Sequence, residues 1–356
     1  MKRTEYLVIG AGIIGCCSAY YLTKAGAKVI VTDKGFACNE ASGVNAGGLD
    51  LLQQPKLALP MYREAADLWD RITNEDGVDT EYNRSGGFYV ILREEDLHIL
   101  DAQIADFHEY GIEVYKLDQT EFREMAPYVS EEAIAANYCP VSGFCNPLKA
   151  GRNILLAAVS HGTEFIYNNP IERIEPAPEG SGYIAVGKEE SIYAEKVLVT
   201  CGVRANKLLE PLGKRLGYDI RFNMMSVTEK APHFLDYTYT TPTLSLKQNA
   251  EGSLIIGGGR DGWGDLETNR KDVSINGLSI NIAEALALVP SMKKLSILRN
   301  WTGIEGFSKD RLPHYGELEQ YPGVFFSVSG YCGLTLGPAL GLHTARMVLG
   351  EEKGSE

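Results

Sequence analysis

A glycine-rich hexapeptide directly after a short apolar run constrains this chain's fold more than any other feature. Residues 5–9, Glu-Tyr-Leu-Val-Ile, predict a strand, and the hexapeptide Gly10-Ala11-Gly12-Ile13-Ile14-Gly15 follows at once. In a GxGxxG turn the first glycine permits the tight bend, the second lets the backbone approach a pyrophosphate, and the third lets the helix pack closely on the strand. The helix N-terminus then faces the anion. Alone, the pattern also fits a purely structural turn, because the chain contains 38 glycines.

The residues that follow complete a dinucleotide-binding unit. Residues 16–25 predict a helix that Gly26 ends, and residues 28–32 predict a second strand. Asp33 follows this strand, 18 residues after Gly15. That distance is close to the roughly 20 residues expected for a carboxylate that binds an adenosine ribose hydroxyl. An acidic residue here disfavours a 2′-phosphate, but NAD and FAD both fit the unit.

The next segment, residues 41–49, favours FAD. Its sequence, Ala-Ser-Gly-Val-Asn-Ala-Gly-Gly-Leu, combines small residues with hydroxyl and amide donors. Such a segment lets the main chain lie against a flat, polar group, whereas a nicotinamide enzyme normally continues here to its next strand. A glycine-rich surface loop is the alternative interpretation.

Composition excludes several other classes of function. The length of 356 residues suggests two domains, and 44% hydrophobic with 23% charged residues is ordinary for a globular protein. The net charge of −13 is spread along the chain, so no basic stripe suggests nucleic acid as a partner. Apolar stretches fall short of the roughly 18 residues of a membrane span, and no signal peptide is evident, so we expect a cytoplasmic protein.

The cysteines predict neither a disulfide framework nor a metal site. Their number is seven, and Cys16 and Cys17 lie in the expected buried helix. Cys139 and Cys145 lie near each other in the sequence, but there is no second pair and no histidine spacing typical of zinc ligands. We therefore expect reduced thiols and no metal.

Taken together, these motifs resemble those of the D-amino-acid-oxidase-like flavoproteins, which include glycine oxidase, sarcosine oxidase and the flavin subunits of bacterial amino-acid dehydrogenases. The resemblance spans nearly the whole chain. Its most specific parts are two C-terminal stretches, Trp-Thr-Gly-Ile-Glu-Gly-Phe-Ser-Lys-Asp-Arg-Leu-Pro at 301–313 and Gly-Tyr-Cys-Gly-Leu-Thr-Leu-Gly-Pro at 330–338.

The resemblance implies an α/β fold with a Rossmann-like FAD-binding domain assembled from separated segments. We expect this domain to comprise residues 1–53, 140–206 and 300–356. An α+β substrate domain, built on an antiparallel or mixed sheet, is expected to comprise residues 54–139 and 207–299. Amphipathic helices at 59–72 and 95–110 and strands at 224–228 and 254–259 belong to this second domain.

Motifs and resemblance together predict the residues that bind FAD. The resemblance implies that N–H groups at the start of a helix beginning at Gly333 face the flavin edge, where reduction leaves negative charge near N1 and C2=O. The whole predicted set is Gly10, Gly12, Ile13, Ile14, Gly15, Asp33, Lys34, Ser42, Asn45, Ala46, Gly47, Gly48, Leu49, Ile171, Cys201, Gly202, Gly303, Gly330, Cys332, Gly333, Leu334 and Thr335.

Two positions depart from the resembling families. Monomeric sarcosine oxidases tether their flavin through a cysteine at the position that matches Gly303, so we expect non-covalent FAD. Glycine oxidases carry a carboxylate-binding arginine at the position that matches Glu305. The form Gly-Ile-Glu-Gly at 303–306 instead resembles the flavin subunits of hydrogen cyanide synthase, opine oxidase and D-hydroxyproline dehydrogenase, which work in multisubunit enzymes and usually have histidine where this chain has Cys332.

Three residues are candidates for the catalytic site. Glu305 is expected on the substrate side of the flavin, where it favours an amine-bearing group. A substrate carboxylate needs a positive or multiply donating partner, for which Arg260 and Tyr331 are the candidates. Arg260 fits an ordinary surface residue equally well.

The function that the resemblance implies is FAD-dependent oxidation of an amine or amino acid. A hydride passes from the α-carbon to flavin N5, and water hydrolyses the resulting imine. We expect the chain to work as the flavin subunit of a multisubunit dehydrogenase, with a partner subunit or other electron acceptor. Two alternatives stay open: a free-standing oxidase that uses oxygen, and a non-catalytic subunit that relays electrons.

Overall fold

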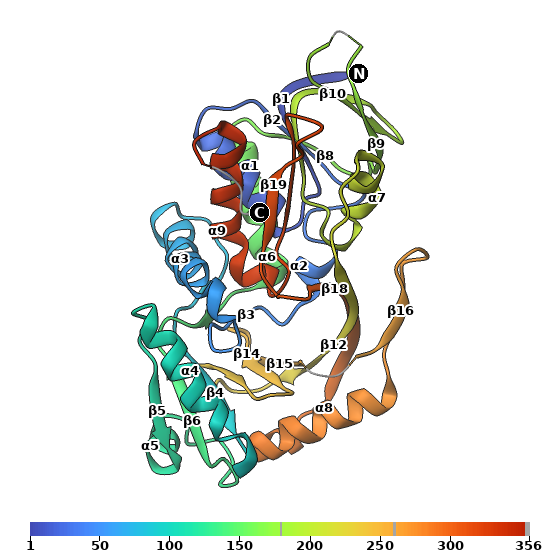
Figure 1. Ribbon diagram of the computed structural model, residues 1–356. Helices are drawn as coiled ribbons and strands as arrows, with labels where there is room; N and C mark the ends of the chain where they lie inside the picture. Colours follow the sequence, from blue (N-terminus) through green and yellow to red (C-terminus); the bar gives the residue numbers. More distant parts are fainter. Residues whose placement is uncertain (179, 259–260, 353–356) are drawn as a thin grey trace.

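Two large sheets organise the computed structural model, which describes residues 1–178, 180–258 and 261–352 (Figure 1). The first sheet has the strand order β19-β20-β11-β1-β2-β8, with β10 pairing β11 and β9. Its strands are β1 (Lys2–Ile9), β2 (Val29–Thr32), β8 (Glu164–Ile166), β9 (Ile171–Pro176), β10 (Tyr183–Gly187), β11 (Ile192–Val199), β19 (His314–Glu317) and β20 (Val324–Val328).

Strand β1 lies at the centre of this sheet and is parallel to both of its neighbours, β11 and β2. Leu7, Val8 and Ile9 are buried. A parallel strand covered on both faces needs such a continuous apolar run. Because successive side chains alternate, Val8 joins one hydrophobic cluster while Leu7 and Ile9 join another.

Helices cover the face of the first sheet to which Val8 points. They are α1 (Ile13–Lys24), α6 (Pro147–Ser160) and α9 (Gly333–Leu349). Close packing of α1 on α9 depends on small residues, because a β-carbon at Gly337 or Gly341 would overlap Ile13 or Cys17. The opposite face is covered by β9, β10 and α7 (Asn206–Leu209). The Rossmann-like α/β fold that the resemblance implies is therefore confirmed.

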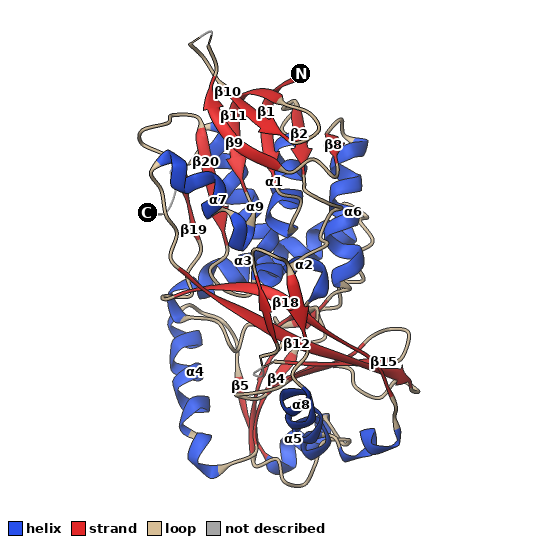
Figure 2. Cartoon of the chain, turned by 90° about the vertical axis from the view of Figure 1, so that its right-hand side faces the viewer, coloured by secondary structure: helices blue, strands red, loops and turns tan. Residues whose placement is uncertain are grey.

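The second sheet forms the other half of the molecule (Figure 2). Its order is β18-β12-β15-β14-β13-β4-β6-β5, and only β13 and β4 pair in parallel. Helices α5 (Gln119–Met125) and α8 (Ile275–Leu288) contribute to the apolar cluster on its outer face. The strands are β4 (Gly87–Ile91), β5 (Tyr115–Asp118), β6 (Ala135–Cys139), β12 (Tyr218–Lys230), β13 (Thr238–Thr240), β14 (Ser245–Gln248), β15 (Ser253–Gly257) and β18 (Ile297–Ser308).

The smaller elements connect these two halves. Helix α2 (Ala41–Val44) and the two-stranded pair β3 (Gly48–Leu49) and β7 (Gly143–Phe144) lie between the sheets. A hairpin of β16 (Trp263–Asp265) and β17 (Arg270–Asp272) projects beside β12 and β18 (Figure 1). Helices α3 (Leu59–Asp70) and α4 (His98–Glu109) complete the fold.

Several element boundaries differ from those that the sequence predicts. Helix α1 begins at Ile13 rather than at residue 16, directly after the extended Gly12. The strand expected to reach residue 259 ends at Gly257, and residues 259 and 260 lie outside the described part of the chain. The domain boundary expected at residue 300 falls inside β18, which pairs with β12 in the second sheet along nearly its whole length.

The seven cysteines are all free. Within residues 1–178, 180–258 and 261–352, no helix combines the length and the apolar character needed to cross a membrane.

Candidate functional site

A cavity of about 930 Å³ lies where the carboxyl ends of the parallel strands meet the inner face of the second sheet. Its walls come from the turns after β1, β2 and β11, from the segment that contains α2, from the start of α9, and from β12 and β18. The carboxyl ends of parallel strands are where doubly wound folds bind their ligands. The cavity therefore joins the glycine turn to the second sheet.

The glycine turn is shaped by backbone contacts that leave no room for side chains. Gly10 has a φ of +107°, and its β-carbon would lie 2.7 Å from the carbonyl oxygen of Thr200. A β-carbon at Gly15 would overlap the carbonyl oxygen of Gly10. At Gly12 the nearest atom to a β-carbon is the Ser42 hydroxyl at 3.4 Å, so this residue faces open space in the cavity. Ser42 also accepts a hydrogen bond from the Ile13 N–H at 3.0 Å.

Asp33 extends from the end of β2 into the same cavity. Its carboxylate accepts hydrogen bonds from the N–H groups of Ala11 (2.7 Å) and Gly35 (2.8 Å). Burial raises the pKa of Asp33, and these two hydrogen bonds oppose that shift. The carboxylate is thus held in place beside the glycine turn.

Asn45 fixes the conformation of the segment after α2. Its side-chain amide donates to the carbonyl oxygens of Ala41 (3.0 Å) and Ser42 (2.9 Å) and accepts from the N–H of Gly47 at 2.7 Å. Behind this segment, the buried Lys247 ammonium donates to the Cys145 carbonyl at 2.7 Å. Burial lowers the pKa of Lys247 to about 8.

The N-terminus of α9 forms another wall of the cavity. Cys332 precedes the helix and has a left-handed φ of 41°. Gly330 has a φ of +67°, and a β-carbon there would overlap the Leu312 carbonyl oxygen. Gly333, Leu334 and Thr335 begin the helix and line the cavity, so their N–H groups lie at the positive end of the helix dipole. Burial raises the pKa of the Cys332 thiol to about 12, which keeps it neutral.

Glu305 occupies the polar end of the cavity, formed by β12 and β18. Its Oε2 accepts a hydrogen bond of 2.6 Å from the side-chain amide of Asn223 on β12. Burial raises the pKa of Glu305, and the hydrogen bond from Asn223 opposes the shift. The neighbouring Cys332 sulfur and burial together raise the pKa of Tyr331, whose phenol stays neutral.

Most of the residues predicted for the site line this one cavity. They are Gly10, Gly12, Ile13, Ile14, Asp33, Lys34, Ser42, Asn45, Ala46, Gly47, Gly48, Ile171, Cys201, Gly202, Gly330, Cys332, Gly333, Leu334, Thr335, Glu305 and Tyr331.

Three predicted residues do not line the cavity, for different physical reasons. Gly15 packs α1 against the turn, and Leu49 belongs to the hydrophobic core. At Gly303 a β-carbon would lie 2.6 Å from the Val44 side chain, so this residue provides space for α2. The predicted residue Arg260 lies outside the described part of the chain.

Sequence reasoning missed several residues of the polar end. Asn223 and Arg221 lie on β12, and they reach the cavity only because β12 pairs with β18 in a register that sets Arg221 opposite Glu305. Arg311 lies within the stretch 301–313 that carries the resemblance, but that pattern alone does not indicate where its side chain points.

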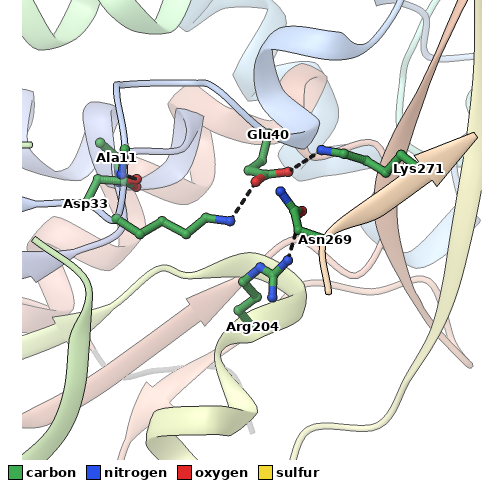
Figure 3. A network of polar contacts seen from close by, with 8 residues as sticks. Ala11, Asp33, Glu40, Arg204, Asn269 and Lys271 are labelled. Atoms are coloured by element: carbon green, nitrogen blue, oxygen red, sulfur yellow. Dashed lines mark hydrogen bonds and ion pairs between the residues drawn. The ribbon is translucent and has the colours of Figure 1, made fainter. Parts of the chain in front are cut away.

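The β16–β17 hairpin connects two walls of the cavity (Figure 3). Glu40 and Arg204 both line the cavity, and each contacts the hairpin. Lys271 pairs with Glu40 at 3.1 Å, and Arg204 donates to Asn269 at 3.1 Å. Lys34 also pairs with Glu40, at 2.6 Å. Burial alone would raise the pKa of Glu40. The two lysines outweigh burial and hold this pKa below its usual value.

A family model described as DAO, FAD dependent oxidoreductase, matches residues 5–347. The chain belongs to this family. Its cavity fits FAD, because the glycine turn leaves space for a pyrophosphate and the buried Tyr218 hydroxyl on the cavity wall has no hydrogen-bond partner among the described residues. The cavity of this flavin oxidoreductase thus has two parts. One is the dinucleotide cradle, formed by the glycine turn and Asp33, and the other is the polar end at Glu305.

Individual relatives match over nearly their whole lengths. One of the subunits of opine oxidase from Agrobacterium tumefaciens (strain Ach5) is 26% identical, over 98% of this chain and 94% of that protein. Glycine oxidase of Bacillus licheniformis is 25% identical, over 100% of this chain and 95% of that protein. The crystal structure of glycine oxidase from Geobacillus kaustophilus superimposes with a TM-score of 0.90 at 23% identity, covering 99% and 96% of the two chains.

Replacement of Gly12 by leucine tests the assignment of the glycine turn. We expect a folded protein that no longer binds FAD, because the side chain extends into the cavity where the pyrophosphate approaches. Gly217→Leu is the matched control, since Gly217 also faces open space but does not line the cavity. Flavin content after purification, together with the unfolding temperature of both apoproteins, is the measurement. A Gly12→Leu protein with full flavin content contradicts the assignment.

Replacement of Lys271 by methionine tests whether the hairpin retains FAD. Loss of the ion pair with Glu40 should speed the release of FAD by roughly two- to fivefold, as expected for one partly exposed pair. Lys24→Met removes an ion pair with Asp76 away from the cavity and should leave the rate unchanged. The release rate is measured from the rise of flavin fluorescence after dilution. Equal rates in both variants mean that the hairpin does not hold the cofactor.

Proposed function

We propose that this chain oxidises an amine or amino acid with FAD and works as the flavin subunit of a multisubunit dehydrogenase. One observation carries the proposal: the glycine turn, the N-terminus of α9 and Glu305 line the same cavity. A dinucleotide bound at Gly12 can therefore extend to the polar end, where a substrate meets a carboxylate rather than an apolar wall.

The residues of the cradle position FAD without a covalent bond. Backbone N–H groups at the start of α1 would face the pyrophosphate of FAD, and Asp33 would offer its carboxylate to the adenosine ribose. Gly303 has no side chain that could attach the flavin. Bound FAD supplies the acceptor for a hydride from the carbon next to the amine. The N–H groups of Gly333 and Leu334 donate toward negative charge at the end of the cavity that they line.

Glu305 orients the amine. Its Oε2 is engaged by Asn223, which leaves Oε1 as an acceptor for a substrate N–H. Because the pKa of Glu305 is raised, the carboxyl also exchanges a proton with an amine more readily than an ordinary glutamate does. The Tyr331 phenol, kept neutral by its raised pKa, donates to Gln53 Oε1 at the long distance of 3.4 Å, and it exchanges this weak partner for a polar group of the substrate.

The likeness to the opine oxidase protein supports the multisubunit part of the proposal. That protein is named as one of the subunits of an oxidase, and it matches this chain over nearly its whole length. The segment Gly303-Ile304-Glu305-Gly306 supports the same conclusion, because it resembles the flavin subunits of multisubunit enzymes. In such an enzyme, electrons leave FAD through a partner subunit.

A free-standing oxidase is the second candidate function. The likeness to glycine oxidases in both sequence and fold favours it. The resemblance implies an arginine in glycine oxidases at the position of Glu305, so this chain does not bind a substrate carboxylate through that position.

Replacement of Glu305 by glutamine tests the role of the carboxylate. We expect kcat/KM for amine substrates to fall by about ten- to a hundredfold, the value of a hydrogen bond to a charged group. In the wild type, kcat/KM should rise with pH as Glu305 ionises, above the usual carboxyl range. Cys332 and Tyr331 titrate at much higher pH and do not contribute to this limb. A pH profile that is the same in the glutamine variant removes Glu305 from the reaction.

The choice of electron acceptor distinguishes the two candidate functions. The purified single chain is first mixed anaerobically with a panel of amines and amino acids, and the loss of flavin absorbance identifies substrates. With such a substrate we expect fast reduction of an artificial dye and slow formation of peroxide in air, because the natural acceptor is a partner subunit. Peroxide formation as fast as dye reduction supports the free-standing oxidase instead. If no amine bleaches the flavin, the proposed substrate class is wrong.

A further inference from the structure

Arg311 has a backbone conformation that a side chain rarely adopts. Its φ of 58° lies in the left-handed region, where a residue other than glycine costs about 1 kcal/mol or more. The residue lies in the turn after β18, three residues beyond Ser308, and it lines the cavity. Backbone strain of this kind is often found at functional sites, so the contacts of Arg311 are the next question.

Hydrogen bonds of the surrounding turn hold Arg311 in this conformation. The Arg311 N–H donates to the Ser308 carbonyl at 3.1 Å. Asp310 accepts from the Ser308 hydroxyl at 2.7 Å and from the Leu312 N–H at 3.0 Å. The turn is docked on the segment before α9, because the Ser308 N–H donates to the Gly330 carbonyl at 2.9 Å. Arg311 is therefore preorganised relative to that segment.

Two aromatic rings support two arginines at this rim. The guanidinium carbon of Arg311 lies 5.0 Å from the ring centre of Tyr331. The guanidinium carbon of Arg221, on β12, lies 5.6 Å from the ring centre of Phe307. The two rings are themselves in contact, with centres 5.3 Å apart. An aromatic face holds a guanidinium in place while its N–H groups stay available for other partners.

Neither arginine is neutralised by a strong ion pair. Arg311 forms no ion pair with any residue that the structure describes. Arg221 contacts Asp261 at 3.4 Å, which is long for a charge-assisted hydrogen bond. Both arginines line the same cavity as Glu305 and Asp261, and Arg221 lies opposite Glu305 in the strand pairing. The polar end thus presents positive groups beside the Glu305 carboxylate.

We propose that Arg311, assisted by Arg221, binds a carboxylate of the substrate, so that the chain selects amines that carry a carboxylate. This inference rests on the proposed function and specifies its substrate class. The carboxylate contacts the two guanidiniums on the Phe307 and Tyr331 rings, and the amine of the same molecule contacts Glu305. A simple amine makes only the second contact. Arg311 therefore determines specificity for the carboxylate, and Glu305 orients the amine.

Replacement of Arg311 by glycine separates this role from a structural one. Glycine adopts a positive φ without strain, so the variant should unfold at the same temperature as the wild type or higher. Propionate and propionamide serve as probes of equal size that lack an amine and cannot be oxidised. Titrated into the FAD-bound wild type, propionate should change the flavin absorbance at lower concentration than propionamide. In Arg311→Gly the dissociation constant for propionate should rise by about ten- to a hundredfold, with no change for propionamide.

Arg299→Ala is the matched control. Arg299 lies on β18, the strand that precedes Arg311 in the chain. Its guanidinium carbon lies 5.1 Å from the ring centre of Trp301, so it also contacts an aromatic ring, but it does not line the cavity. This variant should bind propionate like the wild type, and Arg311→Lys should recover part of the lost affinity. A wild type that does not prefer propionate to propionamide, or an Arg311→Gly variant that binds propionate normally, overturns the proposal. The readout is binding, so a failure of amine oxidation does not affect it and would count only against the proposed function.

Discussion

The close approach of α1 to β1 at the glycine turn is the contact on which the rest of the structure depends. Gly15 sits against the Gly10 carbonyl at a distance that excludes any β-carbon, and Gly10 packs closely on the backbone of Thr200. This contact fixes where α1 begins and which way its N-terminus points. Helix α9 then packs on α1 through Gly337 and Gly341, which sets the N-terminus of α9 on another wall of the same cavity.

Two helix N-termini therefore line one cavity. Their positive dipole ends lie in the same cavity as the carboxylates of Asp33 and Glu305. N–H groups at the start of α1 and α9 that have no carbonyl partner within the helix favour negative charge on a ligand. The protein places its own carboxylates where hydrogen bonds compensate for burial: Asp33 accepts from Ala11 and Gly35, and Glu305 accepts from Asn223. Burial still raises the pKa of both carboxyl groups. Asp33 and Glu305 are thus positioned to accept a hydrogen bond from a hydroxyl or an amine of a ligand rather than to form a salt bridge with the protein.

The second sheet supplies what the dinucleotide cradle lacks. The long antiparallel pair of β12 and β18 carries Arg221, Asn223 and Glu305 to the polar end of the cavity. The hairpin that follows β15 returns to the cradle, where Asn269 and Lys271 contact Arg204 and Glu40. The second half of the molecule therefore provides both the polar end and a contact across the mouth of the cradle.

The sequence alone determined the first sheet and the cradle, because these depend on local patterns. An apolar run, a glycine turn, a helix and an acid occur within 33 residues, so their spacing predicts their geometry. Of the predicted cradle residues, only Gly15, Leu49 and Gly303 fail to line the cavity, since each fills a packing position that spacing does not distinguish from a wall position. The polar end was decided by the tertiary structure. Asn223 and Glu305 are 82 residues apart, and Arg311 meets Tyr331 only after two turns dock. Strand register and turn docking arise from the packing of the whole sheet, which no local pattern records.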